Sequence, residues 1–82
     1  MNICFLIGKI VSDIEFKFVL ESEHISIVIF KLELSNHSIV TVKAYDEMAD
    51  WCYQKLLKED SIGIQGYLNS NMEIVIQEFE YL

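Results

Sequence analysis

The first eighteen residues constrain the fold most, because they alternate between apolar and polar positions, pause, and then alternate again. Residues 2–10 form a period-2 run that contains Gly8. After a polar step at residues 12–13 the alternation resumes, with Phe16 and Phe18 on one face. A strand that serves both halves of a small barrel needs such a break. The sequence therefore predicts a bent first strand, with Phe16 and Phe18 in the core.

The rest of the chain divides where the period of the apolar residues changes. Alternation predicts strands at Ser26–Leu34, Ile39–Tyr45, Ser61–Leu68 and Met72–Tyr81, whereas spacing of three to four residues predicts an amphipathic helix at Asp46–Leu57. The order is three strands, a helix and two strands. We therefore expect an all-β fold, a five-stranded Greek-key OB-fold barrel with one α-helix between strands 3 and 4.

Length and composition limit what this fold can do. The 82 residues suffice for one small domain, and we expect a single OB-fold domain over residues 1–82. Hydrophobic residues make up 52% of the chain, and the mean hydropathy is +0.30. Both faces of the first two strands are apolar, and so small a core can bury only one face of each strand. Self-association as a homodimer or homotetramer is therefore expected.

Charge is unevenly distributed along the sequence. The chain carries six lysines, no arginine and thirteen acids, for a formal net charge of -7. Residues 1–45 hold four lysines against five acids, a net charge of -1, whereas residues 46–82 hold two lysines against eight acids, a net charge of -6. Nucleic-acid-binding proteins are usually basic, so the negative net charge of the whole chain argues against nucleic-acid binding. The acids are nevertheless concentrated outside the first three strands.

Several short motifs stand in order along nearly the whole chain. They are Asn2 with Leu6-Ile7-Gly8, Asp13 to Phe18, Phe30 to Asn36, Val42 to Tyr45 with Met48-Ala49-Asp50, and Lys58 to Leu68. Their order and spacing resemble those of the bacterial single-stranded DNA-binding protein (SSB) family. The resemblance implies an OB-fold that grips single strands by stacking bases on aromatic rings and contacting phosphates with basic residues. It also permits a replication protein as a partner.

The first three strands, which form the nucleic-acid face of OB-folds, contain the candidate site residues. Lys9, Lys17, Lys31 and Lys43 are candidates for phosphate contacts, and Tyr45 is the candidate for base stacking. The lysines are equally interpreted as solvated strand residues, and Tyr45 with Ile27, Ile29 and Ile39 as a subunit interface. The family usually carries a Trp where this chain has Ile39, and its long hairpins are reduced to turns. Binding is therefore expected to be weak.

Other function classes find little support in the residues. We see no Ser/His/Asp grouping, phosphate-cradling glycine loop or paired acid and base, so no enzymatic activity and no cofactor are expected. His24 and His37 lack further ligands nearby, so no metal site is expected. The chain has no basic leader and no stretch of about 20 apolar residues, so we expect a cytoplasmic protein without membrane contact. Cys4 and Cys52 are expected to be reduced.

Two functions from different classes remain open. The first is weak binding of single-stranded DNA without sequence preference, in replication, recombination or repair. The second is an OB-fold assembly subunit that has lost nucleic-acid binding and docks a basic protein partner on its acidic helix side.

Overall fold

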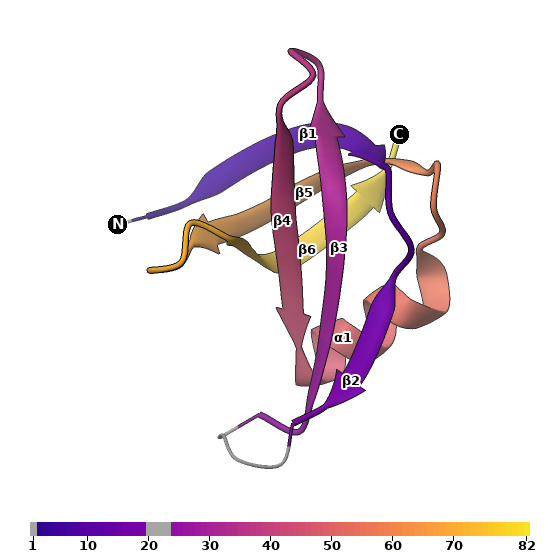
Figure 1. The fold of residues 1–82 in the computed structure, drawn as a ribbon, viewed down its shortest axis with the longest axis vertical. Helices are drawn as coiled ribbons and strands as arrows, with labels where there is room; N and C mark the ends of the chain where they lie inside the picture. Colours follow the sequence, from indigo (N-terminus) through magenta and orange to yellow (C-terminus); the bar gives the residue numbers. More distant parts are fainter. Residues whose placement is uncertain (1, 20–23) are drawn as a thin grey trace.

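The protein folds as a closed β-barrel with one helix. The computed structural model describes residues 2–19 and 24–82. The elements are β1 (Cys4–Ile10), β2 (Glu15–Phe18), β3 (Ser26–Leu34), β4 (Ile39–Tyr45), α1 (Asp46–Lys55), β5 (Ser61–Leu68) and β6 (Ile74–Tyr81), as Figure 1 shows. β1 and β2 together form the predicted bent first strand. The predicted five-stranded OB-fold barrel, with its helix between the third and fourth strands, is therefore confirmed.

The bend in the first strand closes the barrel. β1 pairs with β5 along one edge, and through Gly8, Lys9 and Ile10 it also pairs with β3. β2 then continues along β3. A Cβ atom at Gly8 would lie 2.5 Å from the carbonyl oxygen of Glu33, so the strands can approach this closely only at a glycine. From β5 the sheet continues through β6, β4 and β3, and the β4–β6 pair is parallel.

The polar step between β1 and β2 has a structural role. The backbone N–H of Val11 donates to the carbonyl oxygen of Lys31 at 3.0 Å. The Ser12 hydroxyl accepts a hydrogen bond from the backbone N–H of Lys31 at 2.8 Å. The serine side chain thus satisfies a backbone donor of β3 where the ladder is interrupted.

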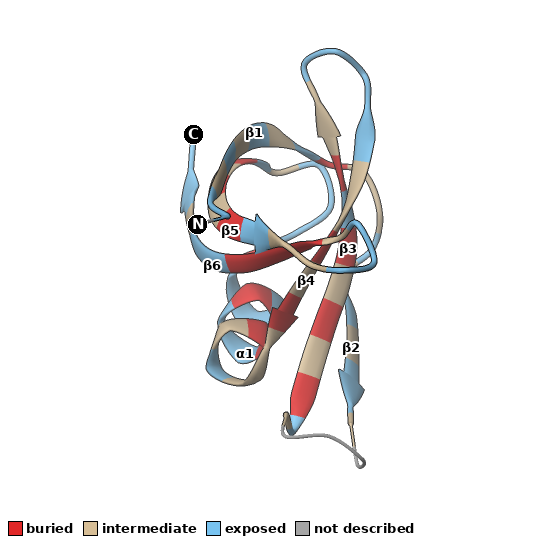
Figure 2. Ribbon diagram, turned by 90° about the vertical axis from the view of Figure 1, so that its left-hand side faces the viewer, coloured by how far each residue is buried: buried red, intermediate tan, exposed pale blue. Residues whose placement is uncertain are grey.

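Inward-facing residues of the strands fill the barrel, and α1 covers one end. The buried strand residues include Ile10, Val28, Phe30, Leu32, Val42, Ala44, Ile62, Ile64, Ile74 and Ile76. Figure 2 shows buried and partly exposed residues alternating along β3. Ala49 and Cys52 of α1 and the following Leu56 complete the core. Burial raises the pKa of the Cys52 thiol to about 12, which keeps it protonated.

Two apolar residues lie outside the core, contrary to expectation. The helix ends at Lys55 rather than at Leu57. Leu57 is 71% exposed, because the chain leaves the helix at Leu56 and the Leu57 N–H binds the Asp60 carboxylate at 2.9 Å. Phe18 is 72% exposed at the last position of β2. It lies past the point where Phe16 contacts α1, so only Phe16 packs against the core.

Candidate nucleic-acid interface

Strands β2, β3 and β4 present one continuous outward surface. Alternate side chains of a strand point to opposite faces, so the residues between the buried positions of β3 and β4 point away from the core. This surface, called the outer face below, consists of Glu15, Lys17, Ile27, Ile29, Lys31, Glu33, Ile39, Thr41, Lys43 and Tyr45. Across the three strands, Lys17, Ile27 and Tyr45 form one row.

The outer face brings together four of the five predicted site residues, which are Lys17, Lys31, Lys43 and Tyr45. Lys9 lies at its margin, where β1 crosses β3. It is opposite Glu33 on β3 and Ser61 on β5. Four of the predicted site residues therefore share one surface, and Lys9 lies at its edge.

Acidic side chains of the same chain form ion pairs with two of the four lysines. The Lys9 ammonium lies 2.8 Å from a carboxylate oxygen of Glu59, and this hydrogen bond raises the pKa of Lys9 and lowers that of Glu59. The Lys43 ammonium lies 3.0 Å from the Glu73 carboxylate, and both side chains are only about one fifth exposed. The pKa of Glu73 is lowered by its hydrogen bonds to Asn69 and Lys43, in that order. Neither lysine presents an unopposed charge.

Lys17 and Lys31 supply the remaining positive charge of the outer face, although Lys31 still interacts electrostatically with Glu73 and helps to lower its pKa. Within residues 2–19 and 24–82, neither lysine is part of an ion pair. The Lys31 ammonium donates to the Thr41 hydroxyl at 2.7 Å, which fixes its position without neutralising it. Both side chains are exposed. The outer face is thus only weakly basic.

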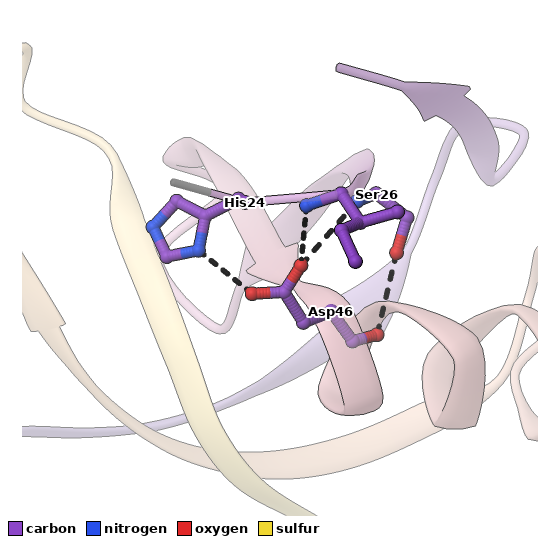
Figure 3. A network of polar contacts seen from close by, with 4 residues as sticks. His24, Ser26 and Asp46 are labelled. Carbon is purple, nitrogen blue, oxygen red and sulfur yellow. Dashed lines mark hydrogen bonds and ion pairs between the residues drawn. The ribbon is translucent and has the colours of Figure 1, made fainter. Parts of the chain in front are cut away.

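Tyr45, at the end of β4, is part of a small aromatic and acidic cluster. Its ring stacks on the imidazole of His24, with 4.3 Å between centroids and 24° between planes. The imidazole Nδ1 lies 2.8 Å from the Asp46 carboxylate, and the Ile25 N–H donates to the other Asp46 oxygen at 2.7 Å (Figure 3). These two hydrogen bonds, the His24 one first, lower the pKa of Asp46.

His24 was not predicted as part of the nucleic-acid site. His24 and Asp46 are 22 positions apart in the sequence, and no local sequence pattern around His24 predicts their contact. Asp46 has a positive φ of 54° where β4 turns into α1, a conformation that aspartate tolerates better than most residues. That turn directs the carboxylate back toward residues 24–26.

The outward side of β1, β5 and β6 has a different chemistry. It holds a shallow hollow of about 330 Å³, which Phe5, Ile7, Gln65, Glu78 and Glu80 line in part. Phe5 is 73% exposed and Ile7 is 65% exposed. Carboxylates repel a phosphate backbone. The residues that line the hollow include no lysine, so this side has no counterpart of Lys17 and Lys31.

Among the described residues, no group of three or more His, Cys, Asp or Glu side chains is arranged to hold a metal ion. In the same part of the chain, no helix has the length and apolar character needed to span a bilayer.

Comparison of the sequence with protein-family models and with curated proteins finds no match. Solved structures do match. The SSB domain of a Synechococcus sp. protein has a TM-score of 0.87 at 15% identity, over 99% of this chain and 96% of that one. The single-stranded DNA-binding protein from Thermus aquaticus has a TM-score of 0.83 at 21% identity, over 100% of this chain and 40% of that one.

A third similar structure is the small single-stranded DNA-binding protein from Streptomyces coelicolor. Its TM-score is 0.80 at 18% identity, over 100% of this chain and 95% of that one. At these identities the similarity establishes the fold. The chain therefore has the OB-fold found in these proteins, as the sequence resemblance implied.

Proposed function

We propose that the chain binds single-stranded DNA weakly and without sequence preference through its outer face, as a non-enzymatic module in replication, recombination or repair. The observation that carries this proposal is the placement of Tyr45, Lys17 and Lys31 on one outward-facing three-stranded surface. Single-strand binding needs an aromatic ring, worth about 1–3 kcal/mol per stacked base, beside cations that follow the backbone. Three similar solved structures carry single-stranded DNA binding in their names, which supports the proposal.

The pairing of Lys9 and Lys43 with acids determines how weak the binding is. If only Lys17 and Lys31 neutralise phosphates, the slope of log K against log salt is about -1.4, and if all four lysines act it is about -3. We expect a slope nearer the first value and micromolar or poorer affinity at physiological salt. Fluorescence anisotropy with labelled oligo-dT at a series of salt concentrations measures both quantities.

Charge-reversal variants test whether the outer face is the site. Lys31→Glu should weaken oligo-dT binding much more than Lys58→Glu, because Lys58 lies in the connection between α1 and β5. Tyr45→Ala should weaken it further by removing the stacking ring. Absence of binding at about 20 mM salt, or equal effects of the two lysine variants, would refute use of the outer face.

We further propose that the chain forms a homodimer or homotetramer through β1 and sits in the cytoplasm. Exposed Phe5 and Ile7 support self-association, because soluble monomers rarely present neighbouring large apolar side chains on one strand. At these residues β1 pairs with β5 on one edge only, and no described strand covers the other edge. An unpaired edge of this kind favours pairing with another chain.

The second candidate function is docking of a basic protein, for instance a replication protein, on the exposed side of α1. That side carries two acids, two aromatic residues and one lysine, namely Glu47, Asp50, Trp51, Tyr53 and Lys55, with the Lys55 ammonium 5.7 Å from the centre of the Trp51 ring. Trp51 is 55% exposed and Tyr53 is 56% exposed. Aromatic rings beside carboxylates suit lysine and arginine side chains. This function becomes the preferred one if oligo-dT does not bind.

A further inference from the structure

We propose that the hollow over β1, β5 and β6 binds an extended segment of another protein in which apolar and basic residues alternate. None of the described residues that line it belongs to the outer face or to α1. Pairing of two copies along the open edge of β1 would extend the sheet sideways and leave this outward side uncovered. The inference therefore concerns a third surface and does not depend on DNA binding.

The register of β1, β5 and β6 arranges the lining of the hollow in two rows, each with an apolar residue on β1 and an acid on β6. The rows are Phe5, Gln65 and Glu78, and Ile7, Gly63 and Glu80. The hollow thus has an apolar wall along β1 and an acidic wall along β6. Its floor is β5, between the two walls.

Gly63 leaves the floor of the hollow bare, although the backbone does not require a glycine there. A Cβ atom at Gly66 would collide with the carbonyl oxygen of Val75, so that position needs glycine. At Gly63 the nearest atoms to a Cβ would be in the side chains of Glu80 and Ile7, at 3.7–3.9 Å, and its φ is not positive. Glycine inside a strand weakens it and often marks close approach of a ligand. Gly63 therefore fits the floor of a binding site.

The acidic wall selects a cationic occupant. Within residues 2–19 and 24–82, neither Glu78 nor Glu80 is part of an ion pair, and no lysine lines the hollow. A second copy placed face to face here would bring its own Glu78 and Glu80 toward these carboxylates, and like charges repel. Lysine or arginine side chains would instead complement them. The occupant is therefore a basic segment of another protein.

The two walls define the sequence pattern of that segment. Successive side chains of an extended chain point to opposite sides. A segment that lies along the strands therefore directs alternate residues toward Phe5 and Ile7, and the others toward Glu78 and Glu80. Side chains on one side of an extended chain are about 7 Å apart, the same spacing as two acids two positions apart on β6. Alternating leucine and lysine satisfies both walls.

The test uses a short labelled peptide of alternating leucine and lysine, and a control peptide of the same composition with all the lysines before the leucines. Anisotropy at low ionic strength should show saturable binding of the alternating peptide and weaker binding of the control. Glu80→Gln should weaken binding about threefold, the effect of one partly exposed ion pair. Asp13→Asn removes an exposed acid between β1 and β2 and should leave the affinity unchanged.

Gly63→Val tests the floor of the hollow. Valine suits a strand and its Cβ has room, so the urea midpoint should not fall. Its branched side chain occupies the floor, so peptide affinity should fall about tenfold. Oligo-dT binding should be unchanged, which keeps this test separate from that of the outer face.

Three results would overturn the inference. Equal binding of the two peptides, or equal effects of Glu80→Gln and Asp13→Asn, would mean that the peptide responds to net charge alone. Absence of binding by wild type would mean that no such segment fits. In that case a change of mass in light scattering for Gly63→Val would identify a second copy as the occupant of the hollow.

Discussion

At the scale of residues, the outer face is limited by acids of the same chain. Glu73 lies close enough to Lys43 to neutralise it, and the two side chains shield each other from water. Exposed ion pairs contribute little to stability, but this one is four-fifths covered and therefore persists at moderate salt. Removing the acid should expose a lysine that now contributes little to binding.

Glu73→Gln should therefore increase the affinity for oligo-dT about threefold and make the salt slope steeper by about 0.7, since one more lysine can meet a phosphate. Glutamine can still accept the hydrogen bond that Asn69 donates to Glu73, so the turn should be preserved. Glu80→Gln makes the same change of net charge on the outward side of β5 and β6 and is the control. Equal gains from both variants would show that only net charge matters.

At the scale of elements, α1 and the residue after it stabilise the barrel. Leu56 is 1% exposed and Leu57 is 71% exposed, although they are adjacent. Leu56→Ala should lower the free energy of unfolding by about 2–5 kcal/mol, because it leaves a cavity under the helix. Leu57→Ala should lower it by less than about 0.5 kcal/mol. Urea denaturation of the two variants measures both, and similar losses would contradict the observed end of the helix.

The junction between β4 and α1 gives a prediction for pH. Hydrogen bonds from His24 and Ile25 lower the pKa of Asp46 in the folded state, so the stabilisation is present above the unfolded value near 4. It is lost as the pH falls through the lower folded value. Asp46→Asn should therefore lose less stability than wild type between pH 5 and pH 2, measured by urea midpoints. Asp50→Asn, an exposed acid of the same helix, should behave as wild type.

At the scale of the whole molecule, alternation of apolar residues predicted the barrel and the surface but not the contacts on it. A period of two fixes which side of β3 carries Lys31, and it also fixes which side carries Phe30. It does not encode the contacts of Lys43 with Glu73 or of Tyr45 with His24, because these depend on how distant segments meet. The predicted C-terminal end of the helix, at Leu57, was wrong for a similar reason. The Leu57 N–H donates a hydrogen bond to the Asp60 carboxylate, and the spacing of apolar residues does not reveal this contact.

The proposed self-association concerns the whole molecule, and the exposed apolar residues of β1 make it testable. Phe5→Ser should shift the protein toward a monomer of 9.6 kDa in light scattering, because it removes the most exposed ring of that side. Leu57→Ser, an equally exposed apolar residue elsewhere, should leave the assembly unchanged. A wild-type protein that is already monomeric at micromolar concentration would refute the proposed oligomer.

The position of the single tryptophan gives the protein an optical signal of its own. Trp51 lies on α1, with the Lys55 ammonium 5.7 Å from the centre of its ring, whereas the outer face belongs to β2, β3 and β4. A nucleic acid on the outer face should leave the intrinsic emission nearly unchanged. A basic protein that covers α1 should shift or quench it. Unlabelled protein can thus report, in one cuvette, which of its two sides a given ligand has occupied.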